Sequence, residues 1–131
     1  MTDRPVRVLL ADVPGPGRRA IAALLSSLVG VVLVADVGSA DELARERPRT
    51  APDVVVVDDR LLAAAGPGLA HAEVPVIVMG LDGDPGYARR AQRLGATAWI
   101  AKEHADELLP EALDRARRDA WSASPWPEPT A

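Results

Sequence analysis

The feature that most constrains this chain is the run at residues 54–57, which is valine at every position and is followed at once by Asp58 and Asp59. A strand with one face in water alternates polar and apolar side chains, whereas a strand that is apolar on both faces lies inside a parallel sheet with helices on both sides. Four other mostly aliphatic runs are further strand candidates: residues 6–11, 31–35, 75–79 and 97–101. The sequence therefore predicts a parallel sheet of five strands, with residues 54–57 in its middle.

Helical patterns fill the segments between these runs. After the first run, apolar residues recur at the i, i+3, i+4, i+7 spacing of one helix face: Ile21, Leu24, Leu25 and Leu28. Ser39 and Glu42 form a capping box that predicts a second helix, and we expect that helix to end before Pro48. Residues 61–73 are rich in Ala and Gly and predict only a short, weak helix.

Two further helices complete the pattern. Residues 87–94 predict one of them, with Gly95 as its C-cap, and residues 104–119 predict the other. Strands that alternate with helices in this way indicate a doubly wound α/β domain of the flavodoxin-like type, with strand order 2-1-3-4-5. We therefore predict one domain at residues 1–120 and regard the Ser/Pro-rich segment 121–131 as a tail or linker.

The composition excludes several classes of protein. The chain has 15 Lys and Arg residues against 19 Asp and Glu residues, so no basic surplus points to a nucleic-acid surface. Cysteine is absent, which removes disulfides, thiolate metal ligands and cysteine nucleophiles. The apolar runs are too short to span a membrane and the first residues carry no apolar signal region, so we expect a soluble cytoplasmic domain without a membrane partner.

Charged residues follow three of the predicted strands. Asp12 follows the first strand, Asp58 the third and Lys102 the fifth. In an open parallel sheet the ligand site lies at the carboxyl ends of the strands, so we expect these three side chains to converge there. Carboxylates suit Mg²⁺ and an ammonium group suits a phosphoryl group, which indicates phosphoryl chemistry at this edge. Each Asp taken alone is equally well explained as a turn former.

The sequence resembles the CheY-like receiver domains of bacterial two-component response regulators, and most closely those that precede a helix-turn-helix output domain of the NarL/LuxR type. Four segments carry the resemblance: residues 8–12, 52–58 with Arg60 just beyond, 74–78 and 95–102. The resemblance implies that Asp58 is the phosphoacceptor, Asp12 an acidic metal ligand and Lys102 the phosphoryl contact. It also places Trp99 at the aromatic switch position and Gly80 at the position of a switch Thr or Ser.

Departures from the family pattern concern this same site. The family has a second acid beside the first, where this chain has Val13, so we expect Mg²⁺ to bind Asp12 and Asp58 only weakly and no cofactor to be required. Gly80 has no hydroxyl group, and we expect no hydroxyl within residues 74–96 to replace it. These departures indicate an atypical receiver that phosphorylation does not switch.

The resemblance also sets the expected partners. A receiver is a signal-input and protein-interaction module and not an enzyme, and this one would control transcription, reaching DNA only through an output domain outside this chain. Its fourth helix, fifth strand and fifth helix would bind a second copy or another protein, with Arg89, Arg90 and Arg93 on that face. Under the alternative interpretation, Asp58 is a working phosphoacceptor and a histidine kinase is its partner.

We expect Asp59 to point away from Asp58.

A second alternative comes from the turn after the first strand. Residues 15–20 fit the G-x-G-x-x-A pattern of dinucleotide-binding proteins, and Asp36 ends the second strand, where an acid would contact a ribose. Against this hypothesis, Pro16 lacks an N–H where backbone donors should face a pyrophosphate. His71 and His104 have no second ligand at metal spacing, and no Ser/His/Asp set predicts hydrolysis.

Overall fold

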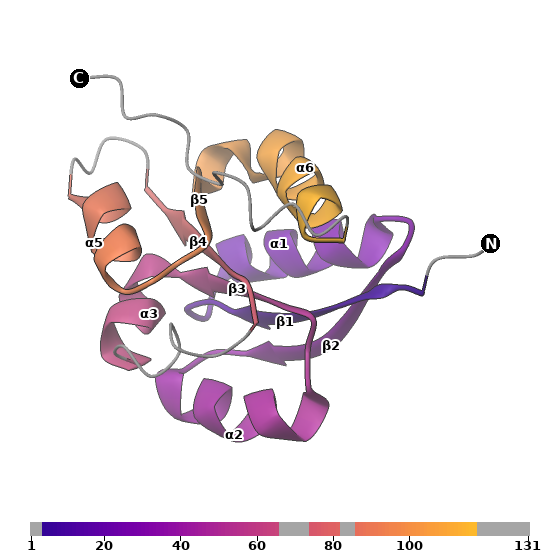
Figure 1. Cartoon of the computed structure of the whole chain (residues 1–131), viewed down its shortest axis with the longest axis horizontal. Helices are drawn as coiled ribbons and strands as arrows, with labels where there is room; N and C mark the ends of the chain where they lie inside the picture. The colour runs from indigo at the N-terminus through magenta and orange to yellow at the C-terminus, as the bar shows by residue number, and fades with distance from the viewer. Residues whose placement is uncertain (1–3, 66–73, 82–85, 118–131) are drawn as a thin grey trace.

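The computed structural model describes residues 4–65, 74–81 and 86–117 (Figure 1). The strands are β1 Val6–Ala11, β2 Val31–Val37, β3 Val54–Asp58, β4 Val76–Gly80 and β5 Ala98–Ala101. The helices are α1 Pro16–Ser27, α2 Ala40–Thr50, α3 Asp59–Ala65, α5 Tyr87–Arg93 and α6 Ala105–Arg117, with a 3₁₀ turn at Lys102–His104.

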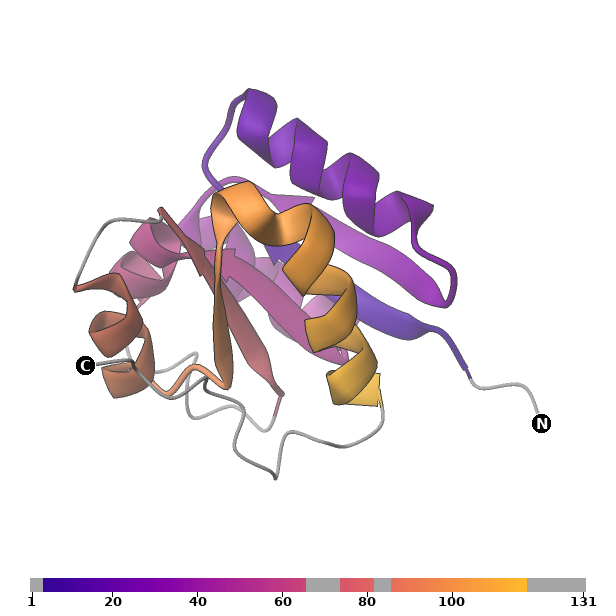
Figure 2. The same ribbon diagram turned by 90° about the horizontal axis from the view of Figure 1, so that it is seen from above.

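The strands form one sheet in which every neighbouring pair is parallel, in the order β2-β1-β3-β4-β5. Helices α1 and α6 cover one face of the sheet, and α2, α3 and α5 cover the other (Figure 1). The turned view shows α1 and α6 lying over the same face (Figure 2). The predicted doubly wound α/β fold and its strand order are therefore confirmed.

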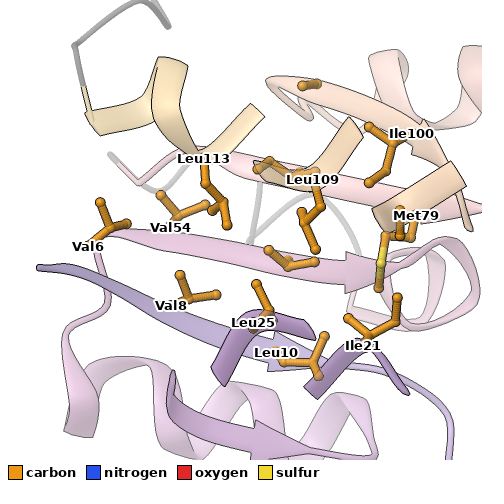
Figure 3. Packing of buried hydrophobic residues seen from close by; sticks show 14 residues of the cluster. Val6, Val8, Leu10, Ile21, Leu25, Val54, Met79, Ile100, Leu109 and Leu113 are labelled. Atoms are coloured by element: carbon orange, nitrogen blue, oxygen red, sulfur yellow. The ribbon is translucent and has the colours of Figure 1, made fainter. Parts of the chain in front are cut away.

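Residues 54–57 of β3 are all apolar because their successive side chains enter two different cores. Val54 and Val56 pack in the core beneath α1 and α6. Val55 and Val57 pack in the core beneath α2, α3 and α5. Figure 3 shows the first core, with Leu109 of α6 between its helix and the sheet. The buried valines fix β3 in the middle of the sheet, so Asp58 at the end of this strand has a well-defined position.

The second helix continues through Pro48, so the prediction that it ends before this residue is wrong. Its start is as predicted, because the Ser39 hydroxyl accepts a hydrogen bond from the Glu42 N–H at 3.1 Å. Pro48 lies in the last turn, where its missing N–H removes one intrahelical bond close to the helix end. The helix ends at Ala51, which has a left-handed backbone (φ 47°) and donates its N–H to the Arg47 carbonyl.

Helix α5 ends as predicted, with Gly95 in the left-handed conformation just beyond it (φ 82°). The Gly95 N–H donates to the Gln92 carbonyl and the Ala96 N–H donates to the Ala91 carbonyl, both at 2.9 Å. These two bonds form a Schellman motif, in which glycine is favoured because it avoids the strain of a positive φ. The cap directs the chain from α5 into β5.

Other predicted boundaries lie partly outside the described residues. Helix α3 begins at Asp59 rather than at residue 61, and residues 66–73 of the expected helix are outside the described part. Helix α6 begins at Ala105, after the 3₁₀ turn, and residues 118–131, including the expected tail, are also outside it. Within the described ranges, no helix is long and apolar enough to cross a membrane.

Candidate functional site

The register of the sheet brings the ends of four strands to one edge. Ala11 of β1 pairs with Val57 of β3, so the residues that follow them, Asp12 and Asp58, reach the same edge. Strands β4 and β5 also end level with each other, at Gly80 and the residue before Lys102. The four positions that the sequence singled out are therefore neighbours at the carboxyl edge of the sheet.

The ammonium group of Lys102 lies between two buried carboxylates. Its Nζ donates hydrogen bonds to Asp12 Oδ1 at 2.6 Å and to Asp58 Oδ2 at 2.9 Å. Asp12 is fully buried and Asp58 is 3% exposed, so both carboxylates need a partner that offsets the loss of water. The structure thus brings together the three side chains that were expected to converge.

Arg60 is a second cation at this site, and the sequence had indicated it only as part of a motif. Its backbone N–H donates to Asp58 Oδ1 at 2.8 Å, and its Nε donates to the same oxygen at 3.1 Å. A terminal guanidinium nitrogen lies 3.4 Å from Asp58 Oδ2. Both oxygens of Asp58 therefore accept hydrogen bonds from cationic side chains of the protein itself.

These contacts fix the charges in the pocket. Burial raises the pKa of a carboxyl group, but the hydrogen bonds from Arg60 and Lys102 outweigh it and hold the pKa of Asp58 below its usual value. Burial lowers the pKa of an ammonium group, but the hydrogen bonds to Asp12 and Asp58 hold the pKa of Lys102 above its usual value. The hydrogen bond to Asp58 also raises the pKa of Arg60. Asp58, Lys102 and Arg60 are therefore all ionised at neutral pH.

The donor set of this pocket does not fit a divalent cation. Val13 supplies no side-chain oxygen, and its backbone N–H donates to Asp12 Oδ1 at 2.8 Å. Of the four carboxylate oxygens of Asp12 and Asp58, only Asp12 Oδ2 accepts no hydrogen bond. Mg²⁺ needs near-octahedral oxygen coordination, and the Lys102 ammonium already lies between the two carboxylates. In the described part of the chain, no cluster of three His, Cys, Asp or Glu residues is placed to hold a metal.

The expectation that no hydroxyl replaces the missing one at Gly80 overlooks Tyr87, the first residue of α5. A Cβ at Gly80 would lie 2.4 Å from the Tyr87 ring, so this ring covers the end of β4. The Tyr87 hydroxyl does not point toward Asp58, because it donates to the Ile100 carbonyl of β5. The ring also meets Trp99 edge-on, with centroids 5.4 Å apart and an interplanar angle of 83°. The contact between this ring and Gly80 was not predicted from the sequence, because it depends on how α5 docks against the sheet.

Asp59 does not add its charge to the pocket. Its Oδ2 accepts a hydrogen bond from Arg90 of α5 at 2.5 Å, and its Oδ1 is buried without a hydrogen-bond partner. The side chain therefore joins α3 to α5, in keeping with the expectation that it points away from Asp58. The pairing with Arg90 could not be read from the sequence, because the two residues lie on elements that only the tertiary fold brings together.

The turn after β1 is built differently from a dinucleotide site. Arg18 Nε donates to Asp36 Oδ1 at 2.7 Å, and another nitrogen of the same guanidinium donates to the Asp36 carbonyl at 2.9 Å. The acid expected to contact a ribose is therefore already paired. No heavy atom lies within 4 Å of a Cβ built at Gly17, so no close approach requires a glycine there. His104 is exposed in the 3₁₀ turn, and His71 lies outside the described residues.

Comparisons with known proteins agree with this geometry at the level of the fold. No family model matches the sequence, and no curated protein is significantly similar to it. The receiver domain of the response regulator NarL from Mycobacterium tuberculosis is 20% identical, with a TM-score of 0.72 over 87% of this chain and 98% of that chain. A LuxR-family two-component response regulator from an Aurantimonas species is 20% identical, with a TM-score of 0.77 over 95% of this chain and 91% of that chain.

A third structure, of the RcsB response regulator from Salmonella typhimurium, is described in connection with DNA interaction. It is 17% identical, with a TM-score of 0.74 over 90% of this chain and 62% of that chain. Identities this low establish a shared architecture and nothing finer. The chain therefore has the fold of response regulator receiver domains, with Asp12, Asp58 and Lys102 at the carboxyl edge of its sheet.

Proposed function

We propose that this chain is an atypical response regulator receiver, a signal-input and protein-interaction module whose state does not depend on phosphorylation of Asp58. The observation that carries the proposal is the double engagement of the Asp58 carboxylate by Lys102 and Arg60. With Val13 in place of a second acid, the two carboxyl groups of the pocket are balanced by two cations of the protein. Such a pocket needs no metal ion or other cofactor to be electrostatically complete.

The chemistry of phosphoryl transfer explains why this arrangement disfavours a phosphoacceptor. A carboxylate attacks phosphorus with an oxygen lone pair, and in known phosphoryl-transfer sites a divalent cation neutralises the charge that gathers on the oxygens. Here the oxygens of Asp58 already accept hydrogen bonds from Arg60 and Lys102. Even a transferred phosphoryl group would meet no hydroxyl at Gly80, so it would gain little differential contact with which to shift a conformational equilibrium.

We also propose a transcriptional setting for the domain. The similar Salmonella regulator is longer than the region it shares with this chain, and its structure concerns DNA interaction. By analogy, DNA would be reached through an output domain that follows the receiver. A second copy or another protein would bind across α5, β5 and α6, where Arg89 and Arg93 on one helix and Asp106 and Glu107 on the other are exposed. The charges of opposite sign suit a reciprocal contact between two copies.

A second candidate function is a working phosphoacceptor domain served by a histidine kinase. The retained convergence of Asp12, Asp58 and Lys102 favours it. Under this alternative, an incoming cation would have to displace the Lys102 ammonium from Asp12, and Arg60 would have to release Asp58. Arg60 is the easier of the two to move, because 64% of its side chain is exposed against 17% for Lys102.

Incubation with Mg²⁺ and acetyl phosphate, followed by intact mass spectrometry, separates the two candidates. We expect the wild-type chain to gain no more mass on incubation than Asp58→Asn, which carries no acceptor and controls for modification elsewhere. A stoichiometric phosphoryl adduct on the wild type, absent from Asp58→Asn, would overturn the proposal and establish the phosphoacceptor function.

A further inference from the structure

Tyr87 occupies an unusual place between three elements. It begins α5, is 3% exposed, and lays its ring over the backbone of Gly80 at the end of β4. A Cβ at Gly80 would lie 2.4 Å from two ring carbons and 2.7 Å from a third, which is well inside van der Waals contact. The ring thus takes the space that any side chain at position 80 would need.

The Tyr87 hydroxyl ties the helix to the edge of the sheet. It donates a hydrogen bond to the Ile100 carbonyl of β5 and lies 3.4 Å from the Val78 carbonyl of β4. Strand β5 is an edge strand that pairs only with β4, so this bond is an additional attachment to α5. Burial raises the pKa of Tyr87 far above the physiological range, so the phenol keeps its proton and remains a donor.

Two more contacts hold α5 in the same position. The Tyr87 ring packs edge-on against Trp99 of β5, and Arg90 pairs with Asp59 at the start of α3. Helix α5 is therefore attached through side chains to β4, β5 and α3. None of these contacts includes Asp58 or Lys102, although they surround the strand ends that carry these two residues.

We propose that Tyr87 is a permanent latch that holds α5, β5 and Trp99 in a single arrangement whatever the state of the Asp58 pocket. A switch requires two arrangements of comparable free energy, and the second arrangement must not leave buried polar groups without hydrogen-bond partners. Moving α5 away from β5 would break the buried Tyr87–Ile100 hydrogen bond and the aromatic contact together, which lowers the population of such an alternative by about tenfold. Moving the Trp99 ring alone would break the aromatic contact. The latch goes beyond the proposed function, because it holds whether or not Asp58 accepts a phosphoryl group.

The first test measures amide hydrogen exchange in the full chain by NMR. Tyr87→Phe keeps the ring over Gly80 and removes only the hydroxyl, so we expect exchange at the β5 amides to accelerate by about tenfold while β1 amides are unchanged. Gln92→Ala, which removes only an exposed side chain from the same helix, is the matched control and should change neither strand. Unchanged β5 exchange in Tyr87→Phe would overturn the latch.

The second test measures communication from the pocket to Trp99. Asp58→Asn changes the pocket charge without any phosphorylation, and the indole N–H resonance of Trp99 reports the response, with the Trp121 and Trp126 signals removed by substitution to Phe. We expect no shift on Asp58→Asn when Tyr87 is present, and a clear shift when the same change is made in Tyr87→Leu. A shift in the presence of Tyr87 would overturn the proposal. If Tyr87→Leu fails to fold, the comparison is made in Tyr87→Phe.

The two proposals fail in different ways. Phosphorylation of Asp58 would contradict the proposed function, but neither readout here depends on phosphorylation. Conversely, a shift of the Trp99 signal on Asp58→Asn would contradict the latch proposal but would not contradict the proposed function.

Discussion

At the scale of single residues, the pocket is decided by which groups balance the two buried acids. Lys102 Nζ lies within 3 Å of oxygens on both Asp12 and Asp58, and Arg60 covers the outer side of Asp58. A buried ion pair contributes little compared with apolar residues of the same size, but removal of one partner leaves an uncompensated charge in a region without water. The partners in this pocket are therefore far more dependent on each other than surface ion pairs are.

The first prediction concerns the central cation. Lys102→Met removes the ammonium group and leaves Asp12 buried without a cation, so we expect the free energy of unfolding to fall by roughly 3–5 kcal/mol. Urea denaturation followed by circular dichroism measures this. Arg49→Gln is the control, because it removes an exposed pair with Glu46 and should leave the urea midpoint nearly unchanged. Equal effects of the two substitutions would contradict the account.

The second prediction is a pH dependence. The folded-state pKa of Asp58 is lowered, so its contribution to stability is complete above the unfolded-state pKa of about 4 and is lost as the pH falls through the lower folded value. We expect wild type to be more stable than Asp58→Asn at neutral pH, and the difference to shrink on acidification below about pH 4. Urea midpoints of both proteins across this range give the answer, and parallel curves would show that Asp58 is not held ionised.

At alkaline pH the pH dependence of stability has the opposite sign, because the folded-state pKa of Lys102 is raised. Its contribution is complete below the unfolded-state pKa of about 10.4 and is lost as the pH rises through the higher folded value. Between these limits, we expect this pocket to make a nearly constant contribution to the free energy of unfolding.

At the scale of helices and strands, the sequence predicted the features that follow from local residue patterns and from which residues end each strand. The all-valine strand was enough to predict a covered parallel sheet. The polar residues at strand ends, together with the 2-1-3-4-5 order expected of a doubly wound domain, predicted the convergence of Asp12, Asp58 and Lys102. Contacts between elements were not predictable, because the Tyr87 ring over Gly80 and the Asp59–Arg90 pair depend on how α5 docks. Helix α2 was predicted too short, since the rule against proline within helices ignores its smaller cost in the last turn.

The third prediction follows from that last turn. Pro48→Ala restores a backbone N–H to an exposed position in α2, so we expect a modest gain of roughly 1 kcal/mol, below the full interior cost of proline. The gain is reduced because proline also restricts the unfolded chain. Thermal unfolding measures the change, and a lower melting temperature would indicate that Pro48 makes a packing contribution we have not identified.

At the scale of the whole molecule, the parts of the domain surface differ in their chemistry. The carboxyl edge of the sheet holds the neutralised pocket, while α5, β5 and α6 present charges of both signs around the half-buried Trp99. A face held in one arrangement would offer partners a constant binding surface. The signal would then lie in the amount of the protein or in the binding of another molecule, and not in the chemistry of Asp58.

The fourth prediction is self-association through this face. We expect analytical ultracentrifugation at high micromolar concentration to detect a dimer that weakens as salt is added, because exposed charges are screened. Arg93→Glu should weaken the dimer, whereas Arg49→Glu on α2, far from the proposed face, should not. A monomer at all concentrations and salt levels would remove the proposed homodimer and leave a different protein as the partner.

A Mg²⁺ titration followed by amide NMR tests whether the protein's own cations complete the pocket. We expect millimolar Mg²⁺ to leave the resonances of Asp12, Asp58 and Lys102 in place, while Val13→Asp, which supplies the missing carboxylate, gains saturable shifts at the same residues. Saturable shifts at these residues in the wild-type chain, at concentrations no higher than those that act on Val13→Asp, would contradict this expectation.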